Sequence, residues 1–171
     1  MDKVMVITGG GRGIGAATAL LAAGQGYRIC INYQSDEQAA HSVLEQVRAL
    51  GAQAIAVRAD VSIEDEVISL FQRVDHELGR VTALVNNAGT CFMSEFPDIP
   101  ADELTRQMEI NFHSAFHCCQ QAIKAMAGRP GVRKIVSRRD TPDNLWVKDP
   151  DSGEMLYRSD LETSLWVTPS G

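Results

Sequence analysis

The sequence Thr8-Gly9-Gly10-Gly11-Arg12-Gly13-Ile14-Gly15 lies between an apolar run, Val4–Thr8, and an alanine-rich segment that begins at Gly13. A strand, a glycine-rich turn and a helix in this order suit a diphosphate, because glycines let the backbone turn sharply and approach the ligand. The helix adds unpaired N–H groups and the positive end of its dipole. The spacing is T-G-x-x-x-G-x-G rather than G-x-G-x-x-G. A turn that merely connects strand to helix is the alternative.

Strand-like and helix-like segments alternate regularly through the first 131 or so residues. The pattern predicts strands at 4–8, 28–33, 52–58, 81–86 and 133–137, and helices at about 13–24, 35–50, 62–78 and 101–126. Ser35 and Ser62 are expected to cap the second and third helices, and Gly51 and Gly79 to end them. This alternation predicts an α/β fold, a doubly wound, Rossmann-like parallel sheet of about five strands with helices on both faces.

The pattern changes near Gly131, which we take as the end of a dinucleotide-binding domain, residues 1–131. Asp149-Pro150-Asp151-Ser152-Gly153 predicts a turn between two strand-like runs, Leu145–Lys148 and Glu154–Tyr157. Residues 132–171 are therefore expected to form an irregular tail that contains a hairpin.

The composition excludes several classes of partner. A formal net charge of -6 argues against nucleic acid and against an anionic membrane surface, and no apolar run is long enough to span a bilayer. The four cysteines lack C-x-x-C spacing, which favours reduced thiols in the cytoplasm. His113 and His117 have a spacing that can bind a metal, but no third ligand accompanies them, so we expect no metal site.

Four motifs occur in an order that resembles the short-chain dehydrogenase/reductase family over about residues 1–131. They are the glycine loop, Asp60-Val61, Asn86-Asn87-Ala88-Gly89 and Asn111. Taken singly, Asp60 could be a loop residue, the asparagine motif a turn, and Asn111 an ordinary polar helix residue. Their joint occurrence favours the family. The resemblance implies NAD(P) binding and, in intact relatives, hydride transfer between the cofactor and a small carbonyl or alcohol substrate.

The resemblance also implies roles for individual residues. Asp60 would accept a hydrogen bond from the adenine amine, and the asparagine motif would border the nicotinamide ribose. Asn111 would be the catalytic asparagine that fixes a water in the proton relay. The implied cofactor-binding residues are Thr8, Gly9, Gly11, Arg12, Gly13, Ile14, Gly15, Asn32, Tyr33, Asp60, Val61, Asn87, Ala88 and Gly89.

The choice between NADP and NAD depends on the residues after the second strand. NAD-preferring sites commonly place an acid there, whereas this chain has Asn32-Tyr33-Gln34-Ser35 and no acid before Asp36. Arg12 could pair with a 2′-phosphate, although it could also be a solvated loop charge. The sequence favours NADP, with NAD as the alternative.

The proton chemistry of the family has no counterpart in the sequence. Intact relatives use a tyrosine to deliver the proton, a lysine four residues later to lower its pKa, and a serine to orient the carbonyl. Tyr157 is the only tyrosine after Asn111, and Leu161 occupies the position that requires lysine. Ser137 follows an apolar run, but its flanks do not resemble the family's serine segment. We therefore expect an inactive, truncated or chimeric nucleotide-binding fragment.

The helix that carries the tyrosine and lysine also forms the dimer interface of intact relatives, which are homo-oligomers. Its loss is expected to expose apolar side chains on the predicted helix at 101–126, and it argues against the same oligomer here. These side chains are Phe112, Phe116, Cys119 and Ile123.

The tail has a resemblance of its own. Residues from about Arg133, above all Arg139–Lys148 and Asp160-Leu161-Glu162, are similar to the N-terminal zinc-ribbon region of the acetyl-CoA carboxylase carboxyltransferase β subunit. The four zinc-binding cysteines of that family are replaced, so no zinc is expected. The replacing residues are Asp149, Ser152, Thr168 and Gly171. A fused reading frame, a divergent member with a replaced C-terminal half, and a partner-binding piece of a carboxyltransferase assembly are the interpretations left open.

Overall fold

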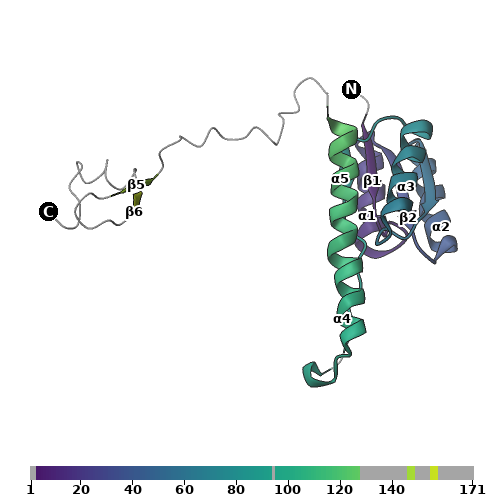
Figure 1. Ribbon diagram of the computed structural model, residues 1–171. Coiled ribbons are helices and arrows are strands. Elements are labelled where there is room, and N and C mark those ends of the chain that lie inside the picture. Colours follow the sequence, from purple (N-terminus) through teal and green to yellow (C-terminus); the bar gives the residue numbers. More distant parts are fainter. Residues whose placement is uncertain (1–2, 94, 128–145, 149–154, 158–171) are drawn as a thin grey trace. The chain divides into compact units, whose positions relative to one another are not determined.

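The computed structural model describes residues 3–93, 95–127, 146–148 and 155–157, and the chain divides into two compact units, residues 1–132 and 133–171. The first unit contains a parallel sheet in the order β3-β2-β1-β4 (Figure 1). Its strands are β1 (Val4–Ile7), β2 (Arg28–Tyr33), β3 (Ala54–Arg58) and β4 (Ala83–Val85). The predicted Rossmann-like α/β architecture is confirmed. The expected fifth strand, 133–137, lies outside the described residues.

Helices cover both faces of the sheet (Figure 1). Successive side chains of a strand point to opposite faces, so Val4 and Val6 pack toward α3 and α5, while Ile7 packs toward α1 and α2. The helical segments are α1 (Gly13–Gly24), α2 (Glu37–Ala49), α3 (Glu64–Glu77), the 3₁₀ turn η1 (Phe96–Asp98), α4 (Ala101–Met108), the π-helical turn η2 (Glu109–His113) and α5 (Ser114–Met126).

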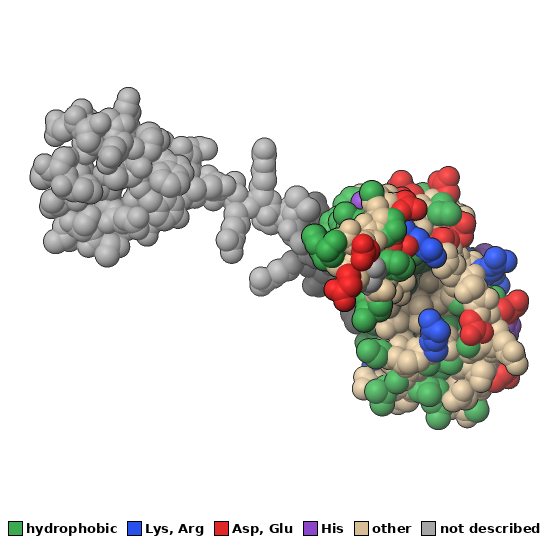
Figure 2. Space-filling model, turned by 90° about the horizontal axis from the view of Figure 1, so that it is seen from below, with side chains coloured by type: hydrophobic (Ala, Val, Ile, Leu, Met, Phe, Trp, Pro, Cys, Tyr) green, Lys and Arg blue, Asp and Glu red, His purple; other side chains and the backbone are tan. Residues whose placement is uncertain are grey.

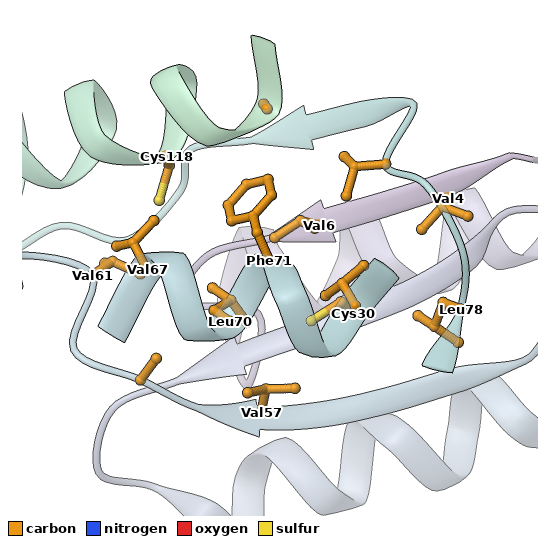
Figure 3. Close-up of a cluster of buried hydrophobic side chains, with 14 residues drawn as sticks. Val4, Val6, Cys30, Val57, Val61, Val67, Leu70, Phe71, Leu78 and Cys118 are labelled. Atoms are coloured by element: carbon orange, nitrogen blue, oxygen red, sulfur yellow. The ribbon is translucent and has the colours of Figure 1, made fainter. Parts of the chain in front are cut away.

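The core beneath α3 and α5 is apolar and closed to solvent. Figure 3 shows Val6, Cys30 and Val57, one from each of three neighbouring strands, directed at the α3 side chains Leu70 and Phe71. Cys118 of α5 completes this cluster and is fully buried. The packing fixes the sheet that carries the loops described below.

Two predicted helix caps are wrong. Asp36, not Ser35, caps α2, because its Oδ1 accepts a hydrogen bond from Ala39 N at 2.9 Å. Helix α3 begins after Ile63, and the Ser62 hydroxyl is instead bonded to the Asp60 carboxylate at 2.6 Å. In both places a neighbouring carboxylate, a charged acceptor, forms the stronger local bond.

The predicted helix over 101–126 is helical throughout, but a π-helical turn, η2, lies within it between α4 and α5, which the sequence did not predict. A π turn adds a residue to the helical repeat, so the side chains before and after it change direction.

The second unit contains the expected hairpin strands. β5 (Trp146–Lys148) and β6 (Met155–Tyr157) pair antiparallel, with Trp146 opposite Tyr157. The predicted turn at 149–153 and the four positions that replace zinc-binding cysteines lie outside the described residues.

The apolar side chains predicted to be exposed on the long helix are exposed. Phe112 is 59% accessible, Phe116 and Ile123 are 53% accessible, and Cys119 is exposed as well. Among the residues with a described conformation, no helix is long and apolar enough to cross a membrane.

Thiol reactivity tests this packing. Burial raises the pKa of Cys118 to about 12 and that of Cys30 further, so both remain protonated at pH 8, where only a thiolate reacts quickly. Cys91 and Cys119 are exposed. We expect a maleimide to label only the latter two rapidly in the native protein and all four in denaturant, as read by peptide mass spectrometry. Rapid native labelling of Cys30 would contradict the described core.

Candidate functional site

The glycine loop leaves backbone donors without partners. Gly9 and Gly13 have φ values of +61° and +53°, a region that disfavours other residues, and Gly10 N donates to Asn32 O at 2.9 Å. Four consecutive N–H groups at the start of α1 make no hydrogen bond within the described part of the chain. They belong to Gly11, Arg12, Gly13 and Ile14. Such groups bind an anion, and the helix dipole favours it.

Gly15 brings the first turn of α1 against the end of β4. A Cβ at this position would lie 2.6 Å from Asn87 Nδ2 and 2.6 Å from Gly9 O, which real Cβ atoms do not tolerate. The glycine at this position is therefore a packing requirement.

Hydrogen bonds hold the loop to the segment after β4. Thr8 Oγ1 accepts from Asn87 N and Ala88 N, both at 3.0 Å, and Asn87 Nδ2 donates to Thr8 O and Gly9 O at the same distance. The Thr8 side chain is almost completely buried. The two loops at the carboxyl ends of β1 and β4 are thus joined.

The side chain of Asn32 ties the loop to the neighbouring strands. Its Nδ2 donates to Ala59 O at 3.0 Å and Val57 O at 3.3 Å, and its Oδ1 accepts from Gly9 N at 3.4 Å. Asn32 is 2% exposed, and its side-chain amide forms hydrogen bonds with the backbone of the site.

Asp60 follows β3 and is held by its neighbours. Oδ1 accepts from the Ser62 amide at 3.0 Å and the Ser62 hydroxyl at 2.6 Å, and Oδ2 accepts from Gln34 Nε2 at 2.6 Å. The carboxylate is therefore fixed at the end of the sheet.

A cleft of about 550 Å³ opens along this edge of the sheet. Figure 2 looks onto this side of the molecule and shows a hollowed surface with positively charged side chains beside it. All but two of the predicted cofactor residues line it: Gly9, Gly11, Arg12, Gly13, Ile14, Asn32, Tyr33, Asp60, Val61, Asn87, Ala88 and Gly89. Thr8 and Gly15 are buried and do not line it.

Sequence reasoning missed other residues of the cleft. They are Gln34, Ser35, Asp36, Ala39, Ala59, Ser62, Thr90, Arg106 and Ile110. Most flank a predicted site residue, so their proximity follows from chain continuity. Arg106 and Ile110 belong to the helical segment that carries Asn111, and helical spacing was the available signal.

Asn111 lies beside the cleft. Within η2, its Oδ1 accepts from Thr90 N and its Nδ2 donates to Thr90 O, both at 2.8 Å. The Asn111 side chain therefore fixes the backbone that follows Gly89, and Thr90 lines the cleft. Single π turns are frequent at functional sites.

The chain matches the family model described as short chain dehydrogenase over residues 3–137. The chain belongs to the short-chain dehydrogenase family. Among its relatives, it is 36% identical to the uncharacterized oxidoreductase YgfF of Escherichia coli, covering 81% of this chain and 60% of that protein. It is 35% identical to L-rhamnose 1-dehydrogenase (NAD(P)(+)) of a Sphingomonas species, covering 79% of this chain and 53% of that enzyme.

Comparison with solved structures also identifies short-chain dehydrogenases/reductases as similar to this chain. The chain resembles a mutant short-chain dehydrogenase/reductase of Serratia marcescens with a TM-score of 0.70 and 29% identity, covering 72% of this chain and 51% of the other. The chain thus spans little more than half the length of these relatives.

Replacing Gly15 tests the close approach of α1 to Asn87. We expect Gly15→Ala to destabilise the protein by about 1–3 kcal/mol, because the added methyl group has no space and the surrounding backbone must shift. A Cβ at Gly24, in the same helix, meets nothing within 4 Å, so Gly24→Ala is the control and is expected to be neutral or slightly stabilising. Urea unfolding of both variants provides the measurement, and equal midpoints would refute the packing.

Proposed function

We propose that the first unit binds NADP(H) in the cleft, with the diphosphate on the backbone N–H groups of Gly11–Ile14. The observation that carries this proposal is the set of unpartnered donors at the start of α1, which face a cleft lined by most of the predicted cofactor residues. Gly15 supports the fit, because the absence of a side chain lets the loop approach the Asn87 segment closely.

The remaining predicted residues suit the rest of a dinucleotide. Asp60, held by Gln34 and Ser62, would accept from the adenine amine, with Val61 beside it. Asn87, Ala88 and Gly89 would border the nicotinamide ribose. A bound cofactor of this kind supplies or accepts a hydride.

We propose that the cleft prefers NADP to NAD. Arg12 lines the cleft, and its guanidinium takes part in no ion pair within the described residues, so it is available to a 2′-phosphate.

Titration with the two reduced cofactors tests both binding and preference. We expect the purified chain to bind NADPH more tightly than NADH. Arg12→Ala should weaken NADPH binding by about tenfold, the loss of one charged hydrogen bond, and leave NADH nearly unchanged. Nucleotide fluorescence reports the dissociation constants. An unchanged NADPH/NADH ratio would remove Arg12 from the preference, and no binding of either nucleotide by folded protein would refute the proposal.

For catalysis, we distinguish intact relatives from this 171-residue chain. In intact relatives the site would transfer a hydride between the cofactor and a small carbonyl or alcohol, in keeping with the name of the Sphingomonas L-rhamnose 1-dehydrogenase. Asn111 would be the member of the proton relay present here. We place the protein in the cytoplasm, in keeping with its four free cysteines.

The 171-residue polypeptide itself is proposed to bind the cofactor without turnover. No Y-x-x-x-K segment occurs in its sequence, and Leu161 follows Tyr157 at the spacing of the required lysine. In the family, the lysine at this position is the cation that favours the ionised form of the phenol. This absence supports a nucleotide-binding fragment over an active reductase.

An activity assay separates the two. The chain, shown to bind NADPH, is expected to oxidise it at the buffer rate over a panel of ketones and sugars at neutral pH. The control is a complete family member assayed on the same panel. Turnover above background, retained in Tyr157→Phe, would show that another group supplies the proton and would overturn the inactivity.

A further inference from the structure

Arg106 is a positively charged residue of the cleft to which none of the family motifs assigns a role. It lies on α4, five residues before Asn111, and lines the cleft together with Ile110, about one helical turn later. Arg12 reaches the same cleft from the loop between β1 and α1. Two arginines from separate elements therefore line one cavity.

An ordinary helix-surface ion pair is the simplest alternative for Arg106. Asp102 and Glu103 precede it by four and three residues, which is the spacing at which helical side chains meet. Neither carboxylate forms an ion pair with Arg106, and Asp102 Oδ1 instead accepts from Glu103 N at 3.1 Å. Within the described residues, the Arg106 guanidinium makes no ion pair and no hydrogen bond.

The acids of the cleft are also engaged elsewhere. Asp36 caps α2 through Ala39 N, and Asp60 accepts from Gln34 and Ser62. No described carboxylate is paired with Arg12 or Arg106, so both remain available to a ligand. The guanidinium fork matches phosphate oxygens, and a dinucleotide places its diphosphate in such a cleft.

We infer that Arg106 is a second cation for the phosphates of the bound dinucleotide and acts on NADPH and NADH alike. The inference rests on the proposed cofactor binding and adds to it a contact from α4. The diphosphate is common to both cofactors, so the effect of Arg106 is shared, whereas the effect of Arg12 is specific to the 2′-phosphate. Arg106 thereby links the α4 segment to cofactor affinity.

Three variants test this assignment: Arg106→Ala, Arg106→Lys and Lys124→Ala. Lys124 is an exposed residue of α5 that does not line the cleft, so its variant controls for loss of one positive charge from the same helical segment. We expect Arg106→Ala to raise the dissociation constants of NADPH and NADH by a similar factor of about ten at low salt. Arg106→Lys should retain most of the affinity, and Lys124→Ala all of it.

Salt distinguishes attraction between charges from a packing effect. Titrations at about 50 and 300 mM KCl should show the difference between wild type and Arg106→Ala shrink at the higher concentration, because ions screen an exposed charge pair. Urea midpoints confirm that each variant is folded.

Two kinds of contrary result have different meanings. Unchanged affinities in Arg106→Ala, an equal loss at both salt concentrations, or a loss confined to NADPH would overturn the inference. Failure of the folded wild type to bind either nucleotide would instead refute the proposed function.

Discussion

The approach of the first turn of α1 to Asn87 is the constraint on which the site depends. The atoms around Gly15 leave no space for a Cβ, and Asn87 Nδ2 donates hydrogen bonds to the carbonyls of Thr8 and Gly9. These contacts set the position of the loop relative to β4 and so determine where the unpartnered N–H groups of α1 point. A shift of the helix by the width of a methyl group would move those donors away from a common anion position.

The sheet explains why the cleft lies where it does. β1 has β2 on one side and β4 on the other, so the chain after β1 enters α1 on one face of the sheet, while the chain after β4 leads to α5 on the other face. Ligands of open parallel sheets bind at such a switch point. Because apolar residues cover both faces of the strands, the polar groups that can meet a ligand lie at this edge.

Much of this arrangement could be predicted from sequence, because apolar periodicity and glycine placement act locally. The start of α2 could not, since Ser35 and Asp36 are both good caps and differ by one position. Asn111, within the π turn, is bonded to the Thr90 backbone, which lies 21 residues away in the sequence. Helical spacing reveals nothing of a partner so distant. The role of the Asn32 amide, bound to backbone at Gly9 and Ala59, likewise appears only in three dimensions.

The corrected cap changes the argument about cofactor preference. Asp36 lines the cleft, although the sequence placed it beyond the position where an acid would oppose a 2′-phosphate. Its carboxylate caps α2 through Ala39 N, and the positive end of that helix offsets part of its charge. The remaining charge would repel a 2′-phosphate, and Arg12, which lines the same cleft, would attract it. The proposed preference for NADP therefore depends on the balance between the Asp36 and Arg12 charges and not on the absence of an acid.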